Sequence, residues 1–371
     1  MEVAFGASLA GKRSFCAMKH VGLNVAADPL FTVAYTGVNA GMVIAVADDP
    51  GMHSSQNEQD SRHYAIAAKL PMLEPADSAE ALAFTRRAYE ISEEFDTPVI
   101  LKMCTRVAHS QSIVETSPRT EGPERPYEKN IAKYVMMPGN AIRRHPVVED
   151  RMRRLAQYAE TCDLNRVEMG DTKLGIITSS TSYQYVKEVF GEEASVLKLG
   201  MVHPMPEGLI RDFAAKVDRL VVVEELDPII ENYCRQLGLT VSGKEALPLE
   251  GEFSQNLVAA KLGGAVHTGT ALEDAIPPRP PVMCAGCPHR GTVLHPGKKQ
   301  VYRAGRHRLL HPGGGGPSER HGDDPLHGRL HQRHPRLQQG IGGEKRGEDG
   351  GRHRRLHLHA LRHDRPGQHR L

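Results

Sequence analysis

Hydrophobic and polar positions along the first 300 residues fall into blocks that predict strands and helices in turn. Residues 41–49 form an apolar run that ends in two acids, a pattern typical of a buried strand. Residues 77–95 repeat apolar positions at helical spacing, with Asp77 or Ser78 as the N-cap. Residues 99–107 form the next apolar run. A strand, a helix and a strand in this order predict a βαβ unit and a mostly parallel sheet.

A second series of the same kind follows a weakly patterned, proline-rich connection over residues 111–145. Pro146 is expected to open a helix whose apolar positions continue to residue 162. Residues 277–281 (PPRPP) indicate a stiff linker, after which a third region begins. Between the helix and the linker, the pattern predicts helices over residues 182–190 and 209–216, and strands over residues 174–178, 194–199 and 220–225. The chain is therefore predicted to hold two α/β units before the linker.

The composition changes sharply in the last 71 residues. Residues 301–371 hold 14 Arg and 1 Lys against 7 acidic residues, together with 11 of the 20 His, and contain no Phe, Met, Cys or Trp. The formal net charge of +2 for the whole chain therefore combines an acidic first part with a basic tail. Such a tail cannot build an ordinary packed core, and we expect it to have no native fold.

Membrane and secretory classes are not favoured by the sequence. The chain contains no apolar run of about 18 residues, the length that a membrane span needs. Its N-terminal segment lacks the basic and apolar regions of a secretory signal. Of the six cysteines, four are isolated, and only Cys284 and Cys287 form a C-x-x-C pair. This usage is typical of a reducing compartment, so we expect a cytoplasmic protein.

The loop after the strand at residues 41–49 is the densest polar segment of the chain. Residues 48–64 are DDPGMHSSQNEQDSRHY, and ligands in α/β folds bind beyond the carboxyl ends of parallel strands. Within this loop, Arg62 is the candidate for a forked contact with a carboxylate. Two alternatives remain open: the segment is a polar surface loop, or Arg62 pairs with a neighbouring aspartate.

Two further segments carry candidate chemistry. The segment MKHVGLNVAADPLF contains Lys19, His20 and Asn24, and His20 is a candidate because of these polar neighbours. The Cys284 and Cys287 pair is compatible with zinc, with an iron–sulfur cluster or with a redox role, but no cysteine follows it to complete a tetrahedral site. The sequence contains no P-loop, H-E-x-x-H or G-x-S-x-G motif.

Three segments, MKHVGLNVAADPLF, VADDPGMHSSQNEQDSRHY and CAGCPHRG, occur in this order. Residues 1–291 thereby resemble the alpha subunit of indolepyruvate:ferredoxin oxidoreductase, a thiamine-diphosphate-dependent 2-oxoacid:ferredoxin oxidoreductase. The resemblance implies an α/β fold in consecutive parts: a pyrimidine-type thiamine-diphosphate domain over residues 1–115, a linker with a helix over residues 116–171, a transketolase-C-like domain over residues 172–262, and a linker with the start of a diphosphate-binding domain over residues 263–291.

The same resemblance implies cofactors and partners. The cofactors of the intact family member are thiamine diphosphate, Mg²⁺ and 4Fe–4S clusters, and its partners are indole-3-pyruvate, coenzyme A, ferredoxin and a beta subunit. Cys284 and Cys287 would form half of an iron–sulfur site. Related subunits act on other 2-oxoacids, and that alternative stays open. The substrate-binding candidates are Arg62, His20, Asn24, His53, Ser54 and Gln59.

The chain departs from the family pattern at both ends. The glutamate that activates the cofactor's aminopyrimidine is expected upstream of Met1, so the catalytic residues are unknown. After residue 291, Arg/His/Gly/Pro-rich sequence over residues 292–371 replaces the diphosphate-binding domain. In a shifted reading frame, three segments of this tail become compatible with apolar, glycine-rich segments of the family. This pattern indicates a frame change near Thr292, and the coding DNA around that position would test it.

We therefore expect the polypeptide as written to bind no cofactor stably and to be inactive. The rival class is a non-enzyme, either an inactive fragment or a chain whose basic tail binds nucleic acid. The tail lacks regular interleaving of basic and aromatic residues, and its histidines show no repeated ligand spacing. These features argue against a nucleic-acid-binding or metal-binding arm.

Overall fold

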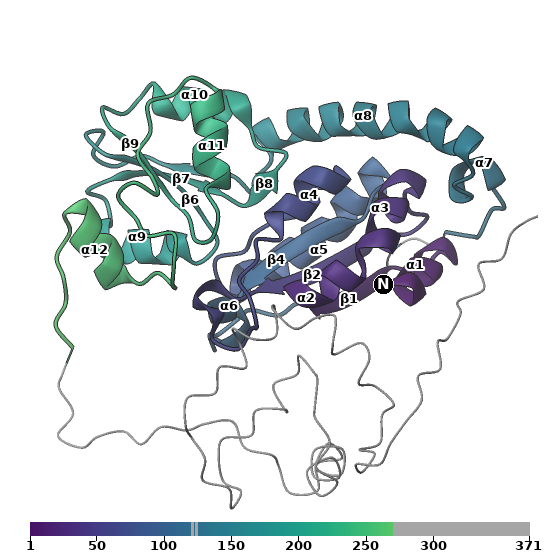
Figure 1. Cartoon of the computed structure of the whole chain (residues 1–371), viewed down its shortest axis with the longest axis horizontal. Helices are drawn as coiled ribbons and strands as arrows, with labels where there is room; N and C mark the ends of the chain where they lie inside the picture. The colour runs from purple at the N-terminus through teal and green to yellow at the C-terminus, as the bar shows by residue number, and fades with distance from the viewer. Residues whose placement is uncertain (120–121, 123–124, 270–371) are drawn as a thin grey trace, which may run out of the picture. The chain divides into compact units, whose positions relative to one another are not determined.

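The computed structural model describes residues 1–119, 122 and 125–269 of the 371-residue chain. These residues belong to one compact unit, Met1–Ala275. The second unit, Ile276–Leu371, lies outside the described residues, and with it the predicted linker, the C-x-x-C pair and the basic tail. Within the first unit, two β-sheets carry helices on their faces (Figure 1).

The first sheet is parallel except at one edge. Its buried strands β2 and β4 carry the Val/Ile/Leu-rich runs expected of strands that are covered on both faces. The predicted strand over residues 41–49 is confirmed, whereas the next strand is shorter than predicted because the chain turns into helix α6 (Thr105–His109). The strand order is β1 (Ser14–Lys19), β2 (Met42–Asp48), β4 (Val99–Cys104), β3 (Met72–Leu73) and the antiparallel β8 (Met201–His203).

The second sheet contains the three strands predicted between residues 174 and 225. Its strand order is β5 (Arg166–Glu168), β7 (Ser195–Leu199), β6 (Gly175–Ser179) and β9 (Leu220–Val223), with β5 antiparallel to β7. Strand β6 lies between β7 and β9. The chain continues from β6 to β7 on one side, and it later adds β9 on the other side of β6. This reversal creates a topological switch point at the carboxyl ends of β6 and β9.

Amphipathic helices cover both faces of the first sheet. Their apolar stripes match the pleat of β2 and β4, so alternate strand residues face opposite helix layers. The helix predicted over residues 77–95 is α5 (Ser78–Phe95), and its N-cap is Asp77, whose Oδ1 accepts the Glu80 amide at 2.9 Å. One layer holds α2 (His20–Val25), α3 (Ala27–Thr36) and α4 (Arg62–Ala68), the other holds α5 and α8 (Pro138–Thr161), and α1 (Glu2–Leu9) packs beside β1.

The second sheet is also covered on both faces. The helices predicted over residues 182–190 and 209–216 correspond to α9 and α10. One face packs against α9 (Ser182–Phe190) and α12 (Gln255–Leu262), and the other against α10 (Glu207–Ala214) and α11 (Ile229–Gln236). Helices on opposite faces follow β6 and β9, which is the arrangement of a doubly wound sheet.

Helix α8 begins earlier than the sequence predicts. Pro146 was expected at its first turn but lies inside the helix, which starts at Pro138 after the short helix α7 (Ile131–Tyr134). Arg144 Nε donates to the Tyr35 carbonyl at 2.8 Å, and an Arg151 N–H donates to the Asp96 carbonyl at 2.7 Å. These cations lie at the carboxyl-terminal ends of α3 and α5, where the helix dipole favours positive charge. Contacts on both sides of the proline thus hold the helix in place.

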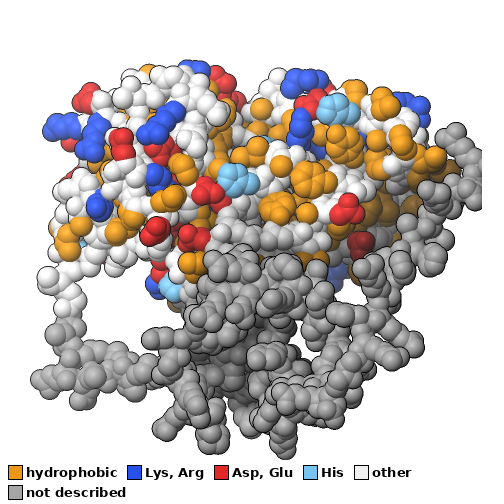
Figure 2. All heavy atoms as spheres, in the orientation of Figure 1, with side chains coloured by type: hydrophobic (Ala, Val, Ile, Leu, Met, Phe, Trp, Pro, Cys, Tyr) orange, Lys and Arg blue, Asp and Glu red, His pale blue; other side chains and the backbone are white. Residues whose placement is uncertain are grey.

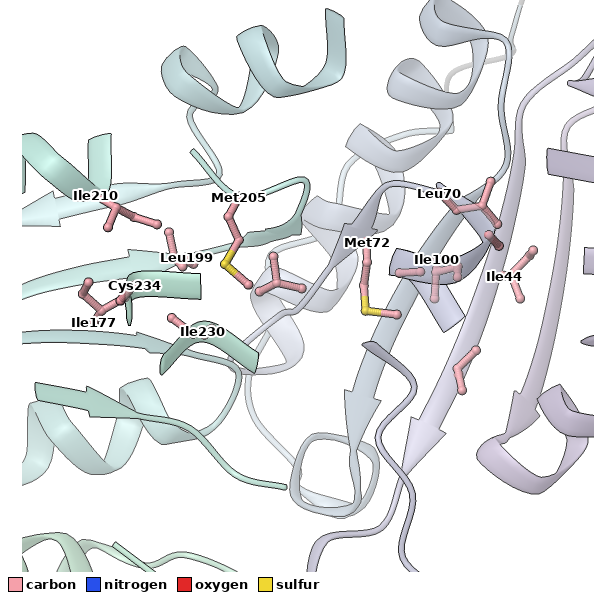
Figure 3. Close-up of a cluster of buried hydrophobic side chains, with 14 of the residues drawn as sticks. Ile44, Leu70, Met72, Ile100, Ile177, Leu199, Met205, Ile210, Ile230 and Cys234 are labelled. Atoms are coloured by element: carbon pink, nitrogen blue, oxygen red, sulfur yellow. The ribbon is translucent and has the colours of Figure 1, made fainter. Parts of the chain in front are cut away.

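One hydrophobic core is continuous between the two sheets. Side chains from β2, β3 and β4 and from α2–α4 contact side chains from β7, β9, α10 and α11, as Figure 3 shows for part of the cluster. Separate clusters lie under α5 and α8 and under α9 and α12. The predicted α/β fold class with parallel sheets is confirmed, and the proposed domain boundaries remain predictions. The labelled members of the shared core are Ile44, Leu70, Met72, Ile100, Ile177, Leu199, Met205, Ile210, Ile230 and Cys234.

None of the described helices combines the length and the apolar character that crossing a bilayer requires.

Candidate functional site

Asp49 follows β2, and its side chain contacts residues at the C-terminal ends of the neighbouring parallel strands β1 and β4. Asp49 Oδ2 accepts hydrogen bonds from Lys19 Nζ at 3.1 Å and from the Ser55 hydroxyl at 2.5 Å, and Asp49 Oδ1 accepts one from the Thr105 hydroxyl at 2.6 Å. The Ser54 amide donates to the same carboxylate at 3.0 Å. Although burial opposes ionisation, the donors from Ser55, Thr105 and Ser54 hold the pKa of Asp49 well below its usual range. An ionised Asp49 therefore fixes the first part of the polar loop.

Arg62 anchors the other end of the loop to the second sheet. Its guanidinium donates to Asp60 Oδ2 at 2.6 Å, to Glu224 Oε2 at 2.5 Å and to the Asp227 carbonyl at 2.8 Å. Arg62 Nη2, which also contacts Asp60 and the Asp227 carbonyl, lies 2.9 Å from the Glu225 carbonyl oxygen, and the Arg62 side chain is only 2% exposed. The structure thus contains the pairing with a neighbouring aspartate that the sequence left open. A direct contact between Arg62 and a substrate carboxylate stays a prediction.

Lys102, in the middle of β4, forms the second cationic centre of the same network. Lys102 Nζ lies 3.0 Å from Glu74 Oε1 and 3.9 Å from Asp48 Oδ2. The Ser179 hydroxyl donates to Glu74 Oε2 at 2.6 Å, and the Ser61 hydroxyl donates to Asp48 Oδ1 at 2.5 Å. Burial acts to lower the pKa of Lys102, but Glu74 and Asp48 outweigh it and raise the pKa. The two carboxylates therefore favour the charged form of Lys102 within the network.

Carboxyl groups outnumber cations in this buried network. Burial raises the pKa of Asp48 to about 6 against the opposing charge of Lys102, and it also raises the pKa values of Glu224 and Glu225. The described residues contain no group of three or more His, Cys, Asp or Glu side chains placed to hold a metal ion. The raised pKa values favour the protonated forms of Asp48, Glu224 and Glu225, and this reduces the excess negative charge of the network. The network consists of Arg62 and Lys102 with Asp48, Asp60, Glu74, Glu224 and Glu225.

Replacing Asp48 with asparagine is expected to change how stability depends on pH. Because the pKa of Asp48 is raised in the folded state, the native protein binds its proton more tightly than the unfolded chain between about pH 4 and pH 6. The free energy of unfolding that Asp48 contributes is therefore largest at low pH and falls as the pH rises through this window, by roughly 2–3 kcal/mol. Urea unfolding at several pH values measures the difference between the wild type and Asp48→Asn. A difference that is constant from pH 4 to pH 7 contradicts the expectation.

Two of the predicted binding residues lie at the surface with partners of their own. His53 Nε2 lies 3.0 Å from Glu252 Oε2, in the segment before α12. Asn24 Oδ1 accepts a hydrogen bond from the Tyr64 hydroxyl at 2.7 Å, which joins α2 to α4. Both His53 and Asn24 are exposed. No described contact joins either of them to Arg62, and their roles in binding stay predictions.

The remaining predicted site residues differ in their surroundings. Gln59 Nε2 donates to Asn57 Oδ1 at 2.9 Å, within the loop itself. His20, the first residue of α2, is 1% exposed, and neither of its ring nitrogens has a hydrogen-bond partner in the described part of the chain. Cys284 and Cys287 lie outside the described residues. His20 is therefore the predicted residue with buried polar atoms left for a ligand.

Several residues of the network were not singled out from the sequence. Lys102 is a charged residue inside the apolar run VILKMC, and Glu224 follows the apolar run LVVV. A charged side chain at a buried strand position is seldom found without a partner. The position of Lys102 and Glu224 in or beside apolar runs could therefore have identified them as members of a buried charge network. Glu74 gave no comparable signal, because it follows a strand of only two residues.

Comparison with known proteins adds the family context. Residues 1–169 match the family model described as pyruvate flavodoxin/ferredoxin oxidoreductase, thiamine diphosphate-binding. The indolepyruvate oxidoreductase subunit IorA of Archaeoglobus fulgidus is 41% identical over 308 residues, which cover 78% of this chain and 49% of that protein. The IorA subunit of Methanothermobacter thermautotrophicus is 42% identical, over 78% of this chain and 50% of its own length. The chain thus spans about half the length of these curated relatives.

A solved structure shares the fold. The 2-oxoglutarate:ferredoxin oxidoreductase from Magnetococcus marinus superposes with a TM-score of 0.54 at 17% sequence identity, covering 70% of this chain and 54% of that chain. At this level of identity the similarity supports the fold alone.

Proposed function

The chain belongs to the family of indolepyruvate oxidoreductase IorA subunits, and from that premise we propose that it is the thiamine-diphosphate-binding alpha subunit of such an enzyme. The reaction we propose for the assembled enzyme is the oxidative decarboxylation of indole-3-pyruvate to an acyl-coenzyme A, with ferredoxin as electron acceptor. The observation that carries the proposal is the identity of 41–42% to IorA subunits over more than three quarters of the chain.

The residues at the end of β1 fit the polar part of a bound thiamine diphosphate. The buried His20 imidazole has no partner among the described residues, and an unpaired buried polar group is unfavourable unless a ligand satisfies it. The adjacent Lys19 is fixed by Asp49, so the strand end beside His20 is rigid. Thiamine diphosphate, when bound, would supply the carbon nucleophile that decarboxylation of a 2-oxoacid requires. We propose that His20 hydrogen-bonds this cofactor or the substrate beside it.

The metal-containing groups of the family find less support in the described residues. No cluster of ligating side chains for Mg²⁺ or a 4Fe–4S centre is formed there, so we derive no step through either group. Cys16, Cys104, Cys162 and Cys234 are free thiols. Free cysteines are typical of a reducing compartment, which supports our proposal of a cytoplasmic enzyme.

An exposed apolar surface supports the proposal of a beta subunit as partner. Figure 2 shows hydrophobic side chains at the surface over the helices that cover the first sheet. Val3 is 89% exposed and Val25 is 86% exposed, and Phe15, Phe31 and Ile66 are also exposed. These side chains belong to α1, β1, α2, α3 and α4, which contact one another in turn, and extended exposed apolar surface often marks a protein–protein interface. We propose that the beta subunit contacts α1–α4 and the free edge of β1.

His20→Ala is expected to weaken binding of thiamine diphosphate about tenfold or more, because a buried hydrogen bond to the ligand is lost. Isothermal titration calorimetry of the full chain with its beta subunit measures the dissociation constant. His109→Ala, which changes an exposed histidine in the last turn of α6, serves as the matched control and should leave binding unchanged. Equal affinities of the wild type and His20→Ala would remove His20 from the proposed site.

The activity itself is tested with the full chain, assayed alone and together with its beta subunit. Reduction of ferredoxin that depends on indole-3-pyruvate and coenzyme A supports the proposal. If 2-oxoglutarate or pyruvate is turned over faster, that 2-oxoacid takes the place of indole-3-pyruvate as the proposed substrate. The expectations that this polypeptide binds no cofactor stably and is inactive stay predictions, which the thiamine diphosphate titration and this assay decide. The Michaelis constant of Arg62→Lys for indole-3-pyruvate tests the predicted contact between Arg62 and the substrate.

A further inference from the structure

The loop between β6 and α9 lies at the switch point of the second sheet, where the carboxyl ends of β6 and β9 meet. Its residues Ser179, Ser180, Thr181 and Ser182 are all buried. None of the amide groups of Ser180, Thr181 and Ser182 donates a hydrogen bond to any residue in the described part of the chain. The first amides of a helix have no partners within the helix, so these three donors face outward from the start of α9.

The backbone of this loop has the form of an anion-binding nest. Ser180 is left-handed, with φ of 51°, and Thr181 is right-handed, with φ of −62° and ψ of −23°. Successive residues of opposite hand turn their amide groups toward a common point. A non-glycine residue is held in the left-handed region only where its surroundings enforce it, and such residues concentrate at ligand sites.

A second observation, independent of the helix terminus, points to a ligand. The Ser180 hydroxyl oxygen is buried and has no hydrogen-bond partner within the described residues, and Ser180 as a whole is only 7% exposed. Ser180 also lines a small cavity between the loop and the first sheet. The other residues of this cavity that matter here are Ser179, Ser182, Lys102, Arg62, Glu74 and Glu225.

The charges around the cavity favour an acceptor over a donor. Arg62 and Lys102 offset Glu74 and Glu225 in formal charge, and the helix terminus adds partial positive charge. Glu74 already contacts Lys102 and the Ser179 hydroxyl. Burial raises the pKa of Glu225 and so favours its neutral form, although the hydrogen bond from the Phe253 amide acts in the opposite direction. In the loop itself, the groups without partners are the three amides and the Ser180 hydroxyl, all of which can donate to an acceptor. Glu74 Oε1 also has no hydrogen-bond partner among the described residues, but it lies 3.0 Å from the Lys102 ammonium.

We propose that the Ser180–Ser182 nest at the start of α9 binds a small anionic group that carries acceptor oxygens, a carboxylate or a phosphate. The anion accepts hydrogen bonds from the free amides and from the Ser180 hydroxyl, and the positive charges of Lys102 and Arg62, which line the same cavity, favour it. The cavity has a free volume of about 10 Å³, which is room for one oxygen-sized atom. The anion would therefore place one acceptor oxygen inside the cavity and the rest of the group outside, as a free ion or as the end of a larger molecule. Helix N-termini with free amides bind such groups in many α/β proteins.

The test is titration calorimetry of the full chain with sodium phosphate, sodium acetate and propyl phosphate at constant ionic strength. We expect saturable binding of at least one of these anions, and an increase of about tenfold in its dissociation constant for Ser180→Ala. Ser180→Gly should give the same loss, because it also lacks the hydroxyl. Glycine tolerates the left-handed backbone, so this second variant keeps the test valid if the alanine variant is strained. Ser117→Ala, at an exposed serine far from the loop in sequence, is the control and should bind like the wild type.

The outcomes separate the possible occupants. Tighter binding of propyl phosphate than of inorganic phosphate identifies the end of a larger molecule, and equal binding identifies the free ion; both support the proposal. Absence of binding of all three anions at 50-fold the protein concentration and above, or unchanged affinity in both Ser180 variants, overturns it. Because the titration requires no turnover and no beta subunit, its result is independent of the proposed oxidoreductase activity.

Discussion

Arg62→Leu is expected to lower the free energy of unfolding by about 3–5 kcal/mol, the cost typical of breaking a buried ion pair from one side. The substitution removes the guanidinium that Asp60 and Glu224 both contact, and it leaves their carboxyl groups buried. It also removes the N–H group that donates a hydrogen bond to the Asp227 carbonyl. The lost contacts join the polar loop to the second sheet, so the loop should become more accessible as well.

Chemical denaturation followed by circular dichroism measures the effect. Arg153→Leu is the matched control, because Arg153 is 69% exposed and its ion pair with Asp150 lies on the surface of α8. Surface pairs contribute about 0–1 kcal/mol, so this control should remain close to the wild type. The free energy of unfolding of Arg62→Lys should lie between those of the two leucine variants, since lysine keeps the positive charge but cannot make the several hydrogen bonds of a guanidinium. Similar stabilities of Arg62→Leu and Arg153→Leu would show that the network contributes little.

Met72→Ala is expected to lower the free energy of unfolding by about 2–5 kcal/mol. Met72 is fully buried in β3, between β4 and the antiparallel strand β8, and it belongs to the core shared by the two sheets (Figure 3). Removing its side chain leaves a cavity at this junction, which the close-packed surroundings fill only in part.

The junction also makes the form of the transition informative. Because the core is continuous, both sheets should lose structure in one cooperative step in the wild type. Met169→Ala, at a methionine that is 49% exposed, provides the control and should change stability by less than about 0.5 kcal/mol. Two separate transitions in the wild type, or equal effects of the two methionine variants, would contradict the shared core.

Local pattern predicted much of the fold. The strand β2 and the helices α5 and α9 follow from apolar spacing within each segment, and the start of α5 follows also from its Asp77 cap. The strands β1 and β8 were not predicted, since β1 carries exposed side chains at the edge of the sheet and β8 spans three residues. Their assignment depends on pairing with distant segments, which no local window contains.

The site shows the same division between local and distant information. The pairing of Arg62 with Asp60 could be anticipated because the two residues lie close in the sequence, but Glu224 comes from the second sheet. Lys102 meets Glu74 and Asp48 only because parallel strands bring their carboxyl ends to one edge. The sequence therefore indicated the loop as a site, whereas the charge network required the three-dimensional arrangement.

The antiparallel pairing of β8 with β3 has a consequence for synthesis on the ribosome. Met72 lies opposite His203, so the edge of the first sheet is completed only after the segment around residue 203 has left the exit tunnel. Until then the nascent chain exposes the edge of β3, an open template for pairing with other chains. Long-range pairing of this kind raises the contact order and slows folding. The period before residue 203 emerges is therefore the one in which the nascent chain is most exposed to mispairing.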